Sequence, residues 1–295
     1  MGFAGTAEPL FGVDLPDYDA IHKWSIESPD QFWSHAWNNL GLIGEMGDRS
    51  LVRGKNLQES VFFPDATLNI AENLLKRNDD TEAIIWVDEL GNTLKLTWAE
   101  LNDQVSLLQQ ALLNLGVGKG DCVAAWLPNR PETISVMIAA ASIGAVFTST
   151  SPDFGVNGLL DRFTQAKPKV LFATDGYFYG GKWFSCLEKL EKVESGLPTL
   201  QQTIVVPYQV KKDVAHDALA GDSRLVWQEF IRAYNPKSIS FPPHSFNHPW
   251  YVLYSSGTTG KPKCIVHRTG GVLLKHLVEH GLQCDVRPRD RVFYY

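Results

Sequence analysis

The sequence predicts an α/β protein in which a parallel sheet is flanked by helices. Short apolar runs, typical of buried strands, alternate with segments of helical periodicity between residues 83 and 173. The clearest of these helical segments carries both a start and a stop signal. With 295 residues, of which 44% are hydrophobic and 20% charged, the chain is large enough to bury such a sheet on both faces.

We expect residues 1–62 to form a helical and extended lead-in rather than part of the sheet. Within it, Asp19 to Trp37 is rich in aromatic residues and predicted to be helical, with its aromatic side chains packing on the main body. Residues 63–295 are then expected to belong to one large domain. That domain begins with a helix that Asp65 or Thr67 caps and that continues to Arg77.

A helix is predicted from Thr97 to Leu115. Thr97 and Glu100 have the spacing of a capping box, in which each side chain accepts a hydrogen bond from the other residue's backbone N–H. Apolar residues recur at steps of three and four along this segment, so one face is expected to be buried. Gly116 follows as the residue that ends the helix.

The remaining segments continue the alternation. Strands are predicted at 83–87, 122–127, 146–149 and 169–173, and helices at 132–143 and 156–166. Residues 207–249 contain five prolines and are expected to be an irregular connection. Residues 291–295 resemble the beginning of an apolar strand, which would leave its ladder incomplete at Tyr295, so we expect the chain to be a fragment of a longer protein.

Composition excludes several functional classes. A net charge of −6 without a long basic run argues against nucleic-acid binding. Residues 1–10 lack the basic and apolar regions of a signal peptide, and no window approaches the roughly 18 apolar residues of a membrane span. The four cysteines show no C-x-x-C spacing, which favours a reduced, cytoplasmic setting.

Residues 254–263, with the sequence YSSGTTGKPK, are the main candidate site. Glycine lets backbone N–H groups approach an anion, while hydroxyls and lysines add further donors and positive charge. Strand-like residues flank the segment at 250–254 and 264–267, so we expect a strand–loop–strand element that binds phosphate. It is not a Walker A loop, which needs a helix after G-K-[ST]. The expected phosphate-binding residues are Ser255, Ser256, Gly257, Thr258, Thr259, Gly260, Lys261 and Lys263.

The order of residues in S-S-G-T-T-G-x-P-K resembles the phosphate-binding signature of the adenylate-forming enzymes, which include the AMP-forming acyl-CoA synthetases. The segments GVGKGD at 116–121 and LPNRPE at 127–132 resemble early blocks of that family. Residues 142–163, 63–75 and 263–267 are most similar to the acetoacetyl-CoA synthetases within it.

This resemblance implies a two-step ligase that uses ATP, Mg²⁺ and coenzyme A. A carboxylate and ATP would give an acyl-adenylate and pyrophosphate, and the coenzyme A thiol would then give the thioester and AMP. The resemblance implies that Thr259 and Lys263 contact the phosphates of ATP in the transition state and that Lys182 contacts coenzyme A. It implies no catalytic residue in this segment, because the family's acyl pocket and C-terminal domain follow later in the sequence. The implied acid is acetoacetate, with another short-chain acid as the alternative.

Other interpretations of particular residues stay open. His276, Glu279 and His280 match H-x-x-E-H, a zinc-hydrolase pattern, although this motif fixes only three positions and few residues follow for a third ligand. His267 is either catalytic or a packed structural histidine, and Lys182 is either a coenzyme A contact or a solvated lysine. Cys264 is expected in the core rather than as a nucleophile. A non-catalytic nucleotide-binding module is the remaining alternative to a ligase.

Overall fold

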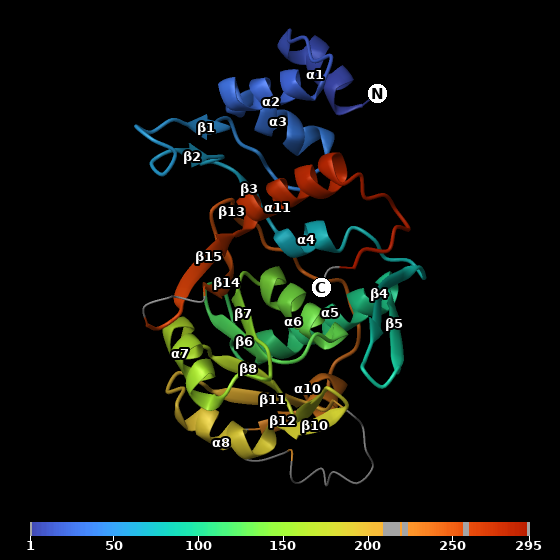
Figure 1. The fold of residues 1–295 in the computed structure, drawn as a ribbon, viewed down its shortest axis with the longest axis vertical. Helices are drawn as coiled ribbons and strands as arrows, with labels where there is room; N and C mark the ends of the chain where they lie inside the picture. Colours follow the sequence, from blue (N-terminus) through green and yellow to red (C-terminus); the bar gives the residue numbers. More distant parts are fainter. Residues whose placement is uncertain (1, 209–218, 220–223, 256–259, 294–295) are drawn as a thin grey trace. The chain divides into compact units, whose positions relative to one another are not determined.

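The computed structural model describes residues 2–208, 219, 224–255 and 260–293. It divides into two compact units. Unit 1 comprises residues 1–73, 243–248 and 268–295, and unit 2 comprises residues 74–242 and 249–267. Each unit is described by itself in the following paragraphs, and Figure 1 gives the labels of their helices and strands.

Unit 2 is built on a seven-stranded sheet with the order β12-β11-β8-β6-β7-β14-β15. The pairs β12–β11, β11–β8, β8–β6, β6–β7 and β7–β14 are all parallel. The predicted fold class, a parallel sheet flanked by helices, is therefore confirmed. The strands are β6 (Cys122–Trp126), β7 (Val146–Thr150), β8 (Val170–Thr174), β11 (Gln202–Val206), β12 (Arg224–Val226), β14 (Pro249–Ser255) and β15 (Lys263–Arg268).

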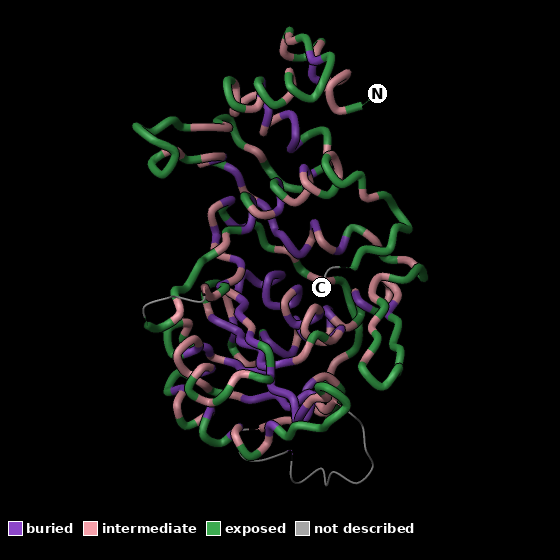
Figure 2. The backbone as a smooth tube through the Cα atoms, in the orientation of Figure 1, coloured by how far each residue is buried: buried purple, intermediate pink, exposed green. Residues whose placement is uncertain are grey.

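Helices cover the sheet because its central strands are apolar on both faces. Strands β6 and β8 are buried along their whole length, as Figure 2 shows. Successive residues of a strand point to opposite faces. Leu171 therefore packs in a cluster with residues of α7 and α8, whereas the Phe172 ring lies 5.9 Å from that of Phe230 in α10. Among the described residues of unit 2, these helices are α5 (Trp98–Asn114), α6 (Pro131–Ser142), α7 (Val156–Ala166), α8 (Leu187–Ser195) and α10 (Trp227–Arg232).

Helix α5 forms as its sequence predicts. The Glu100 amide donates to Oγ1 of Thr97 at 3.1 Å, and the Thr97 amide donates to Oε2 of Glu100 at 2.8 Å, which completes the capping box. At the other end, Gly116 has a φ of +72°, a conformation that glycine adopts without strain. The predicted strands and helices between residues 122 and 174 are likewise present within one or two residues of their expected ends.

Two predictions in unit 2 are wrong. The strand expected at 83–87 is β4 (Glu82–Val87), but it pairs antiparallel with β5 (Thr93–Thr97) in a separate hairpin rather than joining the parallel sheet. The Asp88 carboxylate accepts from the amides of Leu90 and Asn92, which turns the chain back. In addition, residues 207–249 are not only a connection, because they contain β12 and α10, and also β13 (His244–Ser245), which belongs to unit 1.

Side chains of α5 hold part of this irregular segment in place. Gln109 bonds to the backbone of Ser240 twice, donating to its carbonyl at 2.7 Å and accepting from its amide at 3.0 Å. Ser106 does the same with Lys237, at 2.7 Å and 2.9 Å. These bonds satisfy backbone groups that have no strand partner, so an extended segment can pack on a helix.

Unit 1 begins with α1 (Phe3–Phe11), α2 (Tyr18–Glu27) and α3 (Pro29–Asn39). The region predicted as helical from Asp19 to Trp37 is thus two helices. Pro29 opens the second one, and Ser28 before it is not helical, because proline disfavours helical geometry in the preceding residue. The aromatic side chains pack on one another: the Phe3 ring lies 5.7 Å from that of Phe32 and 4.5 Å from that of His35.

The rest of unit 1 corrects two further predictions. The helix expected from Asp65 or Thr67 up to Arg77 is instead the short α4 (Ile70–Leu74). Its start is set by Asn69, which caps it by accepting from the Ala71 amide at 3.0 Å. Residues 67–68 form β3 instead, paired with β13. The strand expected at 291–295 is not found in its described residues, 291–293, since no strand of unit 1 lies alongside to pair with them. Unit 1 also contains β1 (Leu51–Val52), β2 (Val61–Phe62), α11 (Thr269–Val278) and a π-helical turn, η1 (Glu279–Gln283).

Within the described part of the chain, no helix is both long enough and apolar enough to cross a membrane.

Candidate functional site

The segment predicted to bind phosphate connects two strands that are neighbours in the sheet. Strand β14 ends at Ser255, β15 begins at Lys263, and the two lie side by side at one edge of the sheet (Figure 1). The predicted arrangement of two flanking strands is therefore confirmed. Four of the expected phosphate-binding residues lie outside the described residues: Ser256, Gly257, Thr258 and Thr259.

The described ends of this segment are open to an approaching anion. Gly260, Lys261 and Lys263 are exposed, and Ser255 is half-buried. Gly260 has a φ of +144°, a backbone conformation that residues with a side chain disfavour. The conformation, and not a lack of space among the described residues, therefore explains the glycine, because an added Cβ would meet no described atom within 4 Å. Among the described residues, no carboxylate forms an ion pair with Lys263, so its charge is available to a ligand.

The strand that enters the segment is anchored through Tyr254. Oγ1 of Thr148 on β7 lies 2.8 Å from the Tyr254 hydroxyl and donates to the Val252 carbonyl at 2.9 Å. The guanidinium of Arg162 lies over the Tyr254 ring at 5.8 Å and over the Phe154 ring at 4.2 Å. Burial raises the pKa of Tyr254, so the phenol stays protonated and acts as a structural anchor.

The strand that leaves the segment is anchored on helix α7. The ammonium of Lys261 lies 4.0 Å from the carboxylate of Asp161. Nε2 of Gln165 donates to the Pro262 carbonyl at 3.0 Å, and Sγ of Cys264 lies 3.5 Å from Oε1 of Gln165. Cys264 was expected in the core, but it is exposed because β15 is covered on neither face along most of its length.

The region expected to contact coenzyme A is the tip of a hairpin formed by β9 (Gly176–Tyr179) and β10 (Lys182–Ser185). Lys182 is exposed at the start of β10. Gly180 and Gly181 have φ values of +56° and +73°, and their amides donate to the carboxylate of Glu89 at 3.3 Å and 3.0 Å. Two adjacent amides that hold a carboxylate form an anion-binding turn. The structure thus shows the hairpin binding an anion, here one supplied by the same unit.

The structure also bears on the alternative interpretations. The rings of His276 and His280 lie 5.5 Å apart, but the Glu279 carboxylate is paired with Lys275, which lowers the pKa of Glu279. Within the described residues, no group of three or more histidine, cysteine or acidic side chains could hold a metal ion. The ring of His267 is half-buried and packs at 4.7 Å on that of Tyr251, which favours a structural role.

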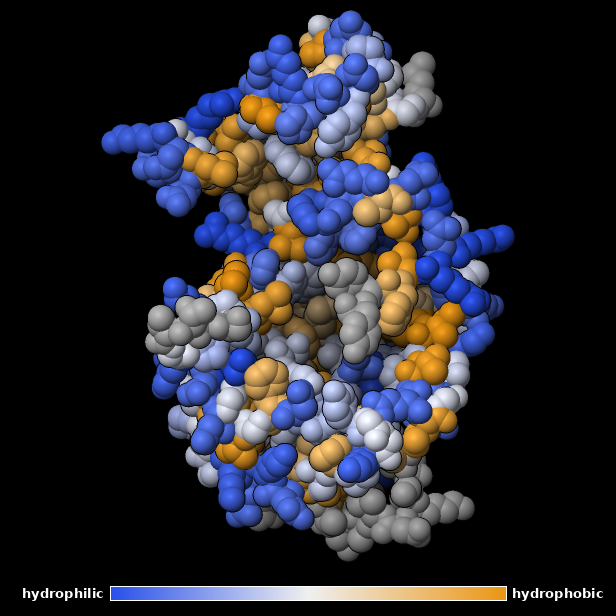
Figure 3. Space-filling view, viewed as in Figure 1, coloured by the Kyte–Doolittle hydropathy of each residue, from blue (hydrophilic) through white to orange (hydrophobic). Residues whose placement is uncertain are grey.

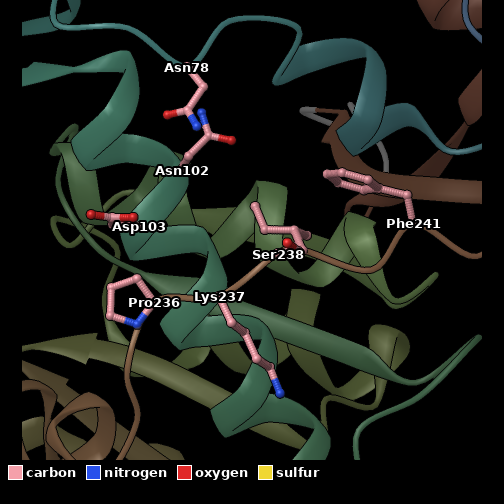
Figure 4. Close-up of a pocket in the computed structure, with 8 residues that line it drawn as sticks. Asn78, Asn102, Asp103, Pro236, Lys237, Ser238 and Phe241 are labelled. Carbon is pink, nitrogen blue, oxygen red and sulfur yellow. The ribbon is translucent and has the colours of Figure 1, made fainter.

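A cavity of about 280 Å³ lies elsewhere in unit 2, between the first half of α5 and residues 236–241. In Figure 4 the amides of Asn78 and Asn102 face one another at its upper side. Nδ2 of Asn102 already donates to the carbonyls of Arg77 and Trp98, both at 2.8 Å. The cavity contains none of the predicted site residues, so we assign the site to the β14–β15 segment and not to this cavity.

Exposed side chains near the candidate site are mixed in character. On β15, Ile265 and Val266 are 46% and 52% exposed, beside the charged Lys263. The face seen in Figure 3 likewise carries small groups of hydrophobic residues among hydrophilic ones.

Comparison with known proteins identifies the family. The family model described as AMP-binding enzyme matches residues 71–295, and that of the acetyl-coenzyme A synthetase N-terminus matches residues 18–74. The chain belongs to the AMP-binding enzyme family. Its Rhizobium meliloti (strain 1021) relative in this family, an acetoacetyl-coenzyme A synthetase, is 44% identical over 285 residues, which cover 97% of this chain and 43% of the relative.

Two further AMP-binding relatives extend the comparison. The solved structure of acetoacetyl-CoA synthetase from Streptomyces lividans superposes with a TM-score of 0.91 at 38% identity, covering 99% of this chain and 45% of that one. The malonamoyl-CoA synthetase vrtB of Penicillium aethiopicum is 35% identical over 299 residues, covering 96% of this chain and 41% of the relative. The chain therefore spans less than half the length of these relatives.

Four side chains that anchor the strands and the hairpin described above carry no local sequence signal of that role: Thr148, Arg162, Gln165 and Glu89. Arg162 lies inside a segment quoted for its family resemblance, 142–163, but nothing local shows which strand it would contact. Their partners are about 100 residues away along the chain, as in the Gln165–Pro262 bond. Only the fold of this AMP-binding chain brings them together.

Proposed function

We propose that the protein containing this chain is an AMP-forming acid–CoA ligase that acts on acetoacetate. The observation that carries the proposal is the similarity to acetoacetyl-CoA synthetases over nearly all of this chain. In the proposed reaction a carboxylate oxygen attacks the α-phosphorus of ATP, and pyrophosphate leaves. The thiolate of coenzyme A then attacks the acyl carbon, and AMP leaves as the thioester forms.

In this proposal the β14–β15 segment binds the phosphates of ATP. Its amides, its hydroxyls and the charges of Lys261 and Lys263 would offset the repulsion between an anionic acid and a polyanion. The exposure of both lysines supports this role. We propose Thr259 and Lys263 as the contacts to the transferring phosphates, with the remaining hydroxyls and glycines around them. This chain supplies no catalytic residue.

Mg²⁺ is expected to neutralise charge on the phosphates in such a ligase. The described residues contain no cluster of acidic or histidine side chains that could hold it.

For coenzyme A we propose a contact at the β9–β10 hairpin. Lys182 supplies a positive charge, and the anion-binding amides of Gly180 and Gly181 lie beside it in the sequence. The carboxylate of Glu89 that now occupies these amides would have to give way to a phosphate of coenzyme A.

The proposal extends to organisation and setting. Residues 1–62 would form a lead-in and residues 63–295 part of an adenylation domain. The partners would be small molecules, namely a short keto acid, ATP and coenzyme A, and not nucleic acid, in keeping with the net charge of −6. A cytoplasmic location is supported by the four cysteines, all of which are free thiols.

The test is carboxylate-dependent exchange of pyrophosphate into ATP by the complete gene product, with acetoacetate, acetate and 3-hydroxybutyrate compared. We expect exchange to be fastest with acetoacetate. Faster exchange with another of these acids would retain the ligase and reject the substrate. Binding of ATP without exchange for any acid would instead favour a non-catalytic nucleotide-binding module.

The similarity to a malonamoyl-CoA synthetase favours one further candidate, a short acid with an amide in place of the ketone. Malonamate therefore belongs in the same comparison. Its carbonyl oxygen lies at the same position as that of acetoacetate, so the two acids differ mainly in one terminal group that donates hydrogen bonds in the amide and not in the ketone.

A further inference from the structure

Helix α7 contacts both strands that hold the β14–β15 segment. Arg162 lies over the ring of Tyr254, which precedes the segment, and Gln165 bonds to Pro262 near its end. We propose that α7 positions the phosphate-binding segment, with Gln165 and Arg162 as positioning residues. This inference rests on the proposed function, because it concerns the same site.

Gln165 fixes one peptide plane. Its Nε2 donates at once to the Pro262 carbonyl at 3.0 Å and to the Asp161 carbonyl one turn earlier in α7 at 2.6 Å. An amide nitrogen has two hydrogens, so both bonds can form together. The Pro262 carbonyl and the Lys263 nitrogen belong to the same planar peptide. The hydrogen bond from Gln165 to the Pro262 carbonyl therefore fixes the orientation of the peptide plane that leads into Lys263.

Arg162 fixes the other strand. Its guanidinium lies over the Phe154 ring at 4.2 Å and over the Tyr254 ring at 5.8 Å, and Nη1 donates to the Gly158 carbonyl at 2.6 Å. A Cβ on Gly158 would come within 3.2 Å of the Phe154 ring, so the glycine leaves room for this stack. Among the described residues, Arg162 has no carboxylate partner. Its interactions are thus with the rings and its own helix.

Together these contacts set the distance between the two ends of the segment. Arg162 and Gln165 are three positions apart on a helix, so they lie on the same side of it. Both described ends of the segment therefore contact the same helix. Preorganised donors act on a transition state only if their spacing is held in this way.

The first experiment separates positioning from general stability. Gln165→Met keeps the length and helix propensity of the side chain but removes all three hydrogen bonds of the amide, to Asp161, Pro262 and Cys264. Thr164→Ala is the matched control, because Thr164 is the adjacent exposed residue and, among the described residues, its side chain bonds to the Leu160 carbonyl of α7 itself. Hydrogen–deuterium exchange of the peptide containing residues 260–268 should become about 3- to 10-fold faster in the first variant, the effect of losing one exposed hydrogen bond, and stay unchanged in the control.

The second experiment measures ATP–pyrophosphate exchange by the complete gene product. For Gln165→Met we expect kcat to fall about 3- to 10-fold, while KM for the acid and the melting temperature stay at their wild-type values. Arg162→Leu should behave in the same way, and Arg162→Lys should recover part of the loss because it keeps a cation over Tyr254. A protein that merely loses stability would lower its melting temperature and leave kcat per folded molecule unchanged.

The outcomes distinguish the two ideas. If the wild-type protein exchanges pyrophosphate and Gln165→Met matches it in both kcat and deuterium uptake, the positioning role of α7 is wrong. If the wild-type protein shows no exchange with any acid, the proposed function fails, and deuterium uptake alone decides whether α7 holds the segment.

Discussion

Replacing Thr148 by valine should destabilise unit 2 more than replacing Tyr254 by phenylalanine. Thr148→Val keeps the shape of the side chain but removes Oγ1, which lies within 2.9 Å of both the Tyr254 hydroxyl and the Val252 carbonyl. Both groups therefore lose a hydrogen-bond partner. Each buried group left unsatisfied costs about 1–3 kcal/mol, so we expect a loss of about 2–4 kcal/mol in the free energy of unfolding. Tyr254→Phe removes a single bond and leaves Thr148 bonded to Val252, which should cost about 1 kcal/mol.

The two changes should also be coupled. In the Tyr254→Phe background no phenol remains to be orphaned, so Thr148→Val should cost about 1 kcal/mol less than it does alone. The measurement is urea unfolding of the wild type, both single variants and the double variant, followed by far-ultraviolet circular dichroism. Thr150→Val is the matched control on the same face of β7, because Oγ1 of Thr150 is buried with no hydrogen-bond partner among the described residues. We expect this control to be neutral or stabilising. Single-variant losses that add to within about 0.3 kcal/mol would refute the reasoning.

Three further predictions concern charge, and one concerns thiols. Lys263→Ala should slow acetoacetate-dependent pyrophosphate exchange by ~10²-fold, the effect of losing one preorganised donor, and an unchanged rate would contradict its assignment. Burial raises the pKa of the Asp175 carboxyl, so its contribution to stability is full below the unfolded pKa of about 3.8 and is lost as pH rises through the higher folded pKa. The melting temperature of Asp175→Asn relative to that of the wild type should therefore increase as the pH is raised from 4 to 7. A difference between the two melting temperatures that stays constant with pH would show that Asp175 does not titrate in this range. Glu89→Ala should lower the KM for coenzyme A by about 2- to 5-fold, which is the size of effect expected from one exposed charge pair, and Lys182→Glu should raise this KM. If the KM is unaltered in both variants, coenzyme A does not bind at this hairpin. After brief alkylation of the native protein, mass spectrometry should find the exposed thiols of Cys264 and Cys284 modified. The buried thiols of Cys122 and Cys186 should be protected, because burial raises the pKa of each to about 12.

Much of unit 2 is predictable because its signals are local. Helix α5 carries its own capping box at Thr97 and its own terminating glycine at Gly116. Strands β6 and β8 are apolar along their full length, as expected of strands covered on both faces. Each of these features involves residues within a few positions of one another, so the sequence alone suffices to locate them.

The errors arise where a partner far along the chain decides the structure. Strand β4 was correctly located, but its apolar pattern does not say whether it joins a parallel sheet or a hairpin with β5. The helix expected up to Arg77 is shortened because residues 67–68 pair with β13 from beyond residue 240. Propensity gives way to tertiary pairing in both cases.

The candidate site divides in the same way. The order of hydroxyls, glycines and lysines at 254–263 was enough to predict a phosphate-binding segment between two strands. The same stretch contains no information about Thr148, Arg162 or Gln165, whose partners are fixed only when β7, α7, β14 and β15 assemble. A motif can therefore indicate which groups face a ligand without showing what holds them in place.

Two separate segments that resemble the family differ in their residues. Residues 142–163 contain no lysine, whereas residues 254–263 combine hydroxyls, glycines and two lysines, the pattern that predicts phosphate binding. In the structure, the first segment supplies Thr148 and Arg162 to the tyrosine that opens the second. If residues 254–263 bind the phosphates as proposed, a substitution in the first segment that moved Tyr254 would displace these donors, and an error of about 1 Å can cost ~10² in rate. The first segment thus acts as scaffold for the second, and functional changes in this family should be sought in α7 and β7 as well as in the phosphate-binding segment.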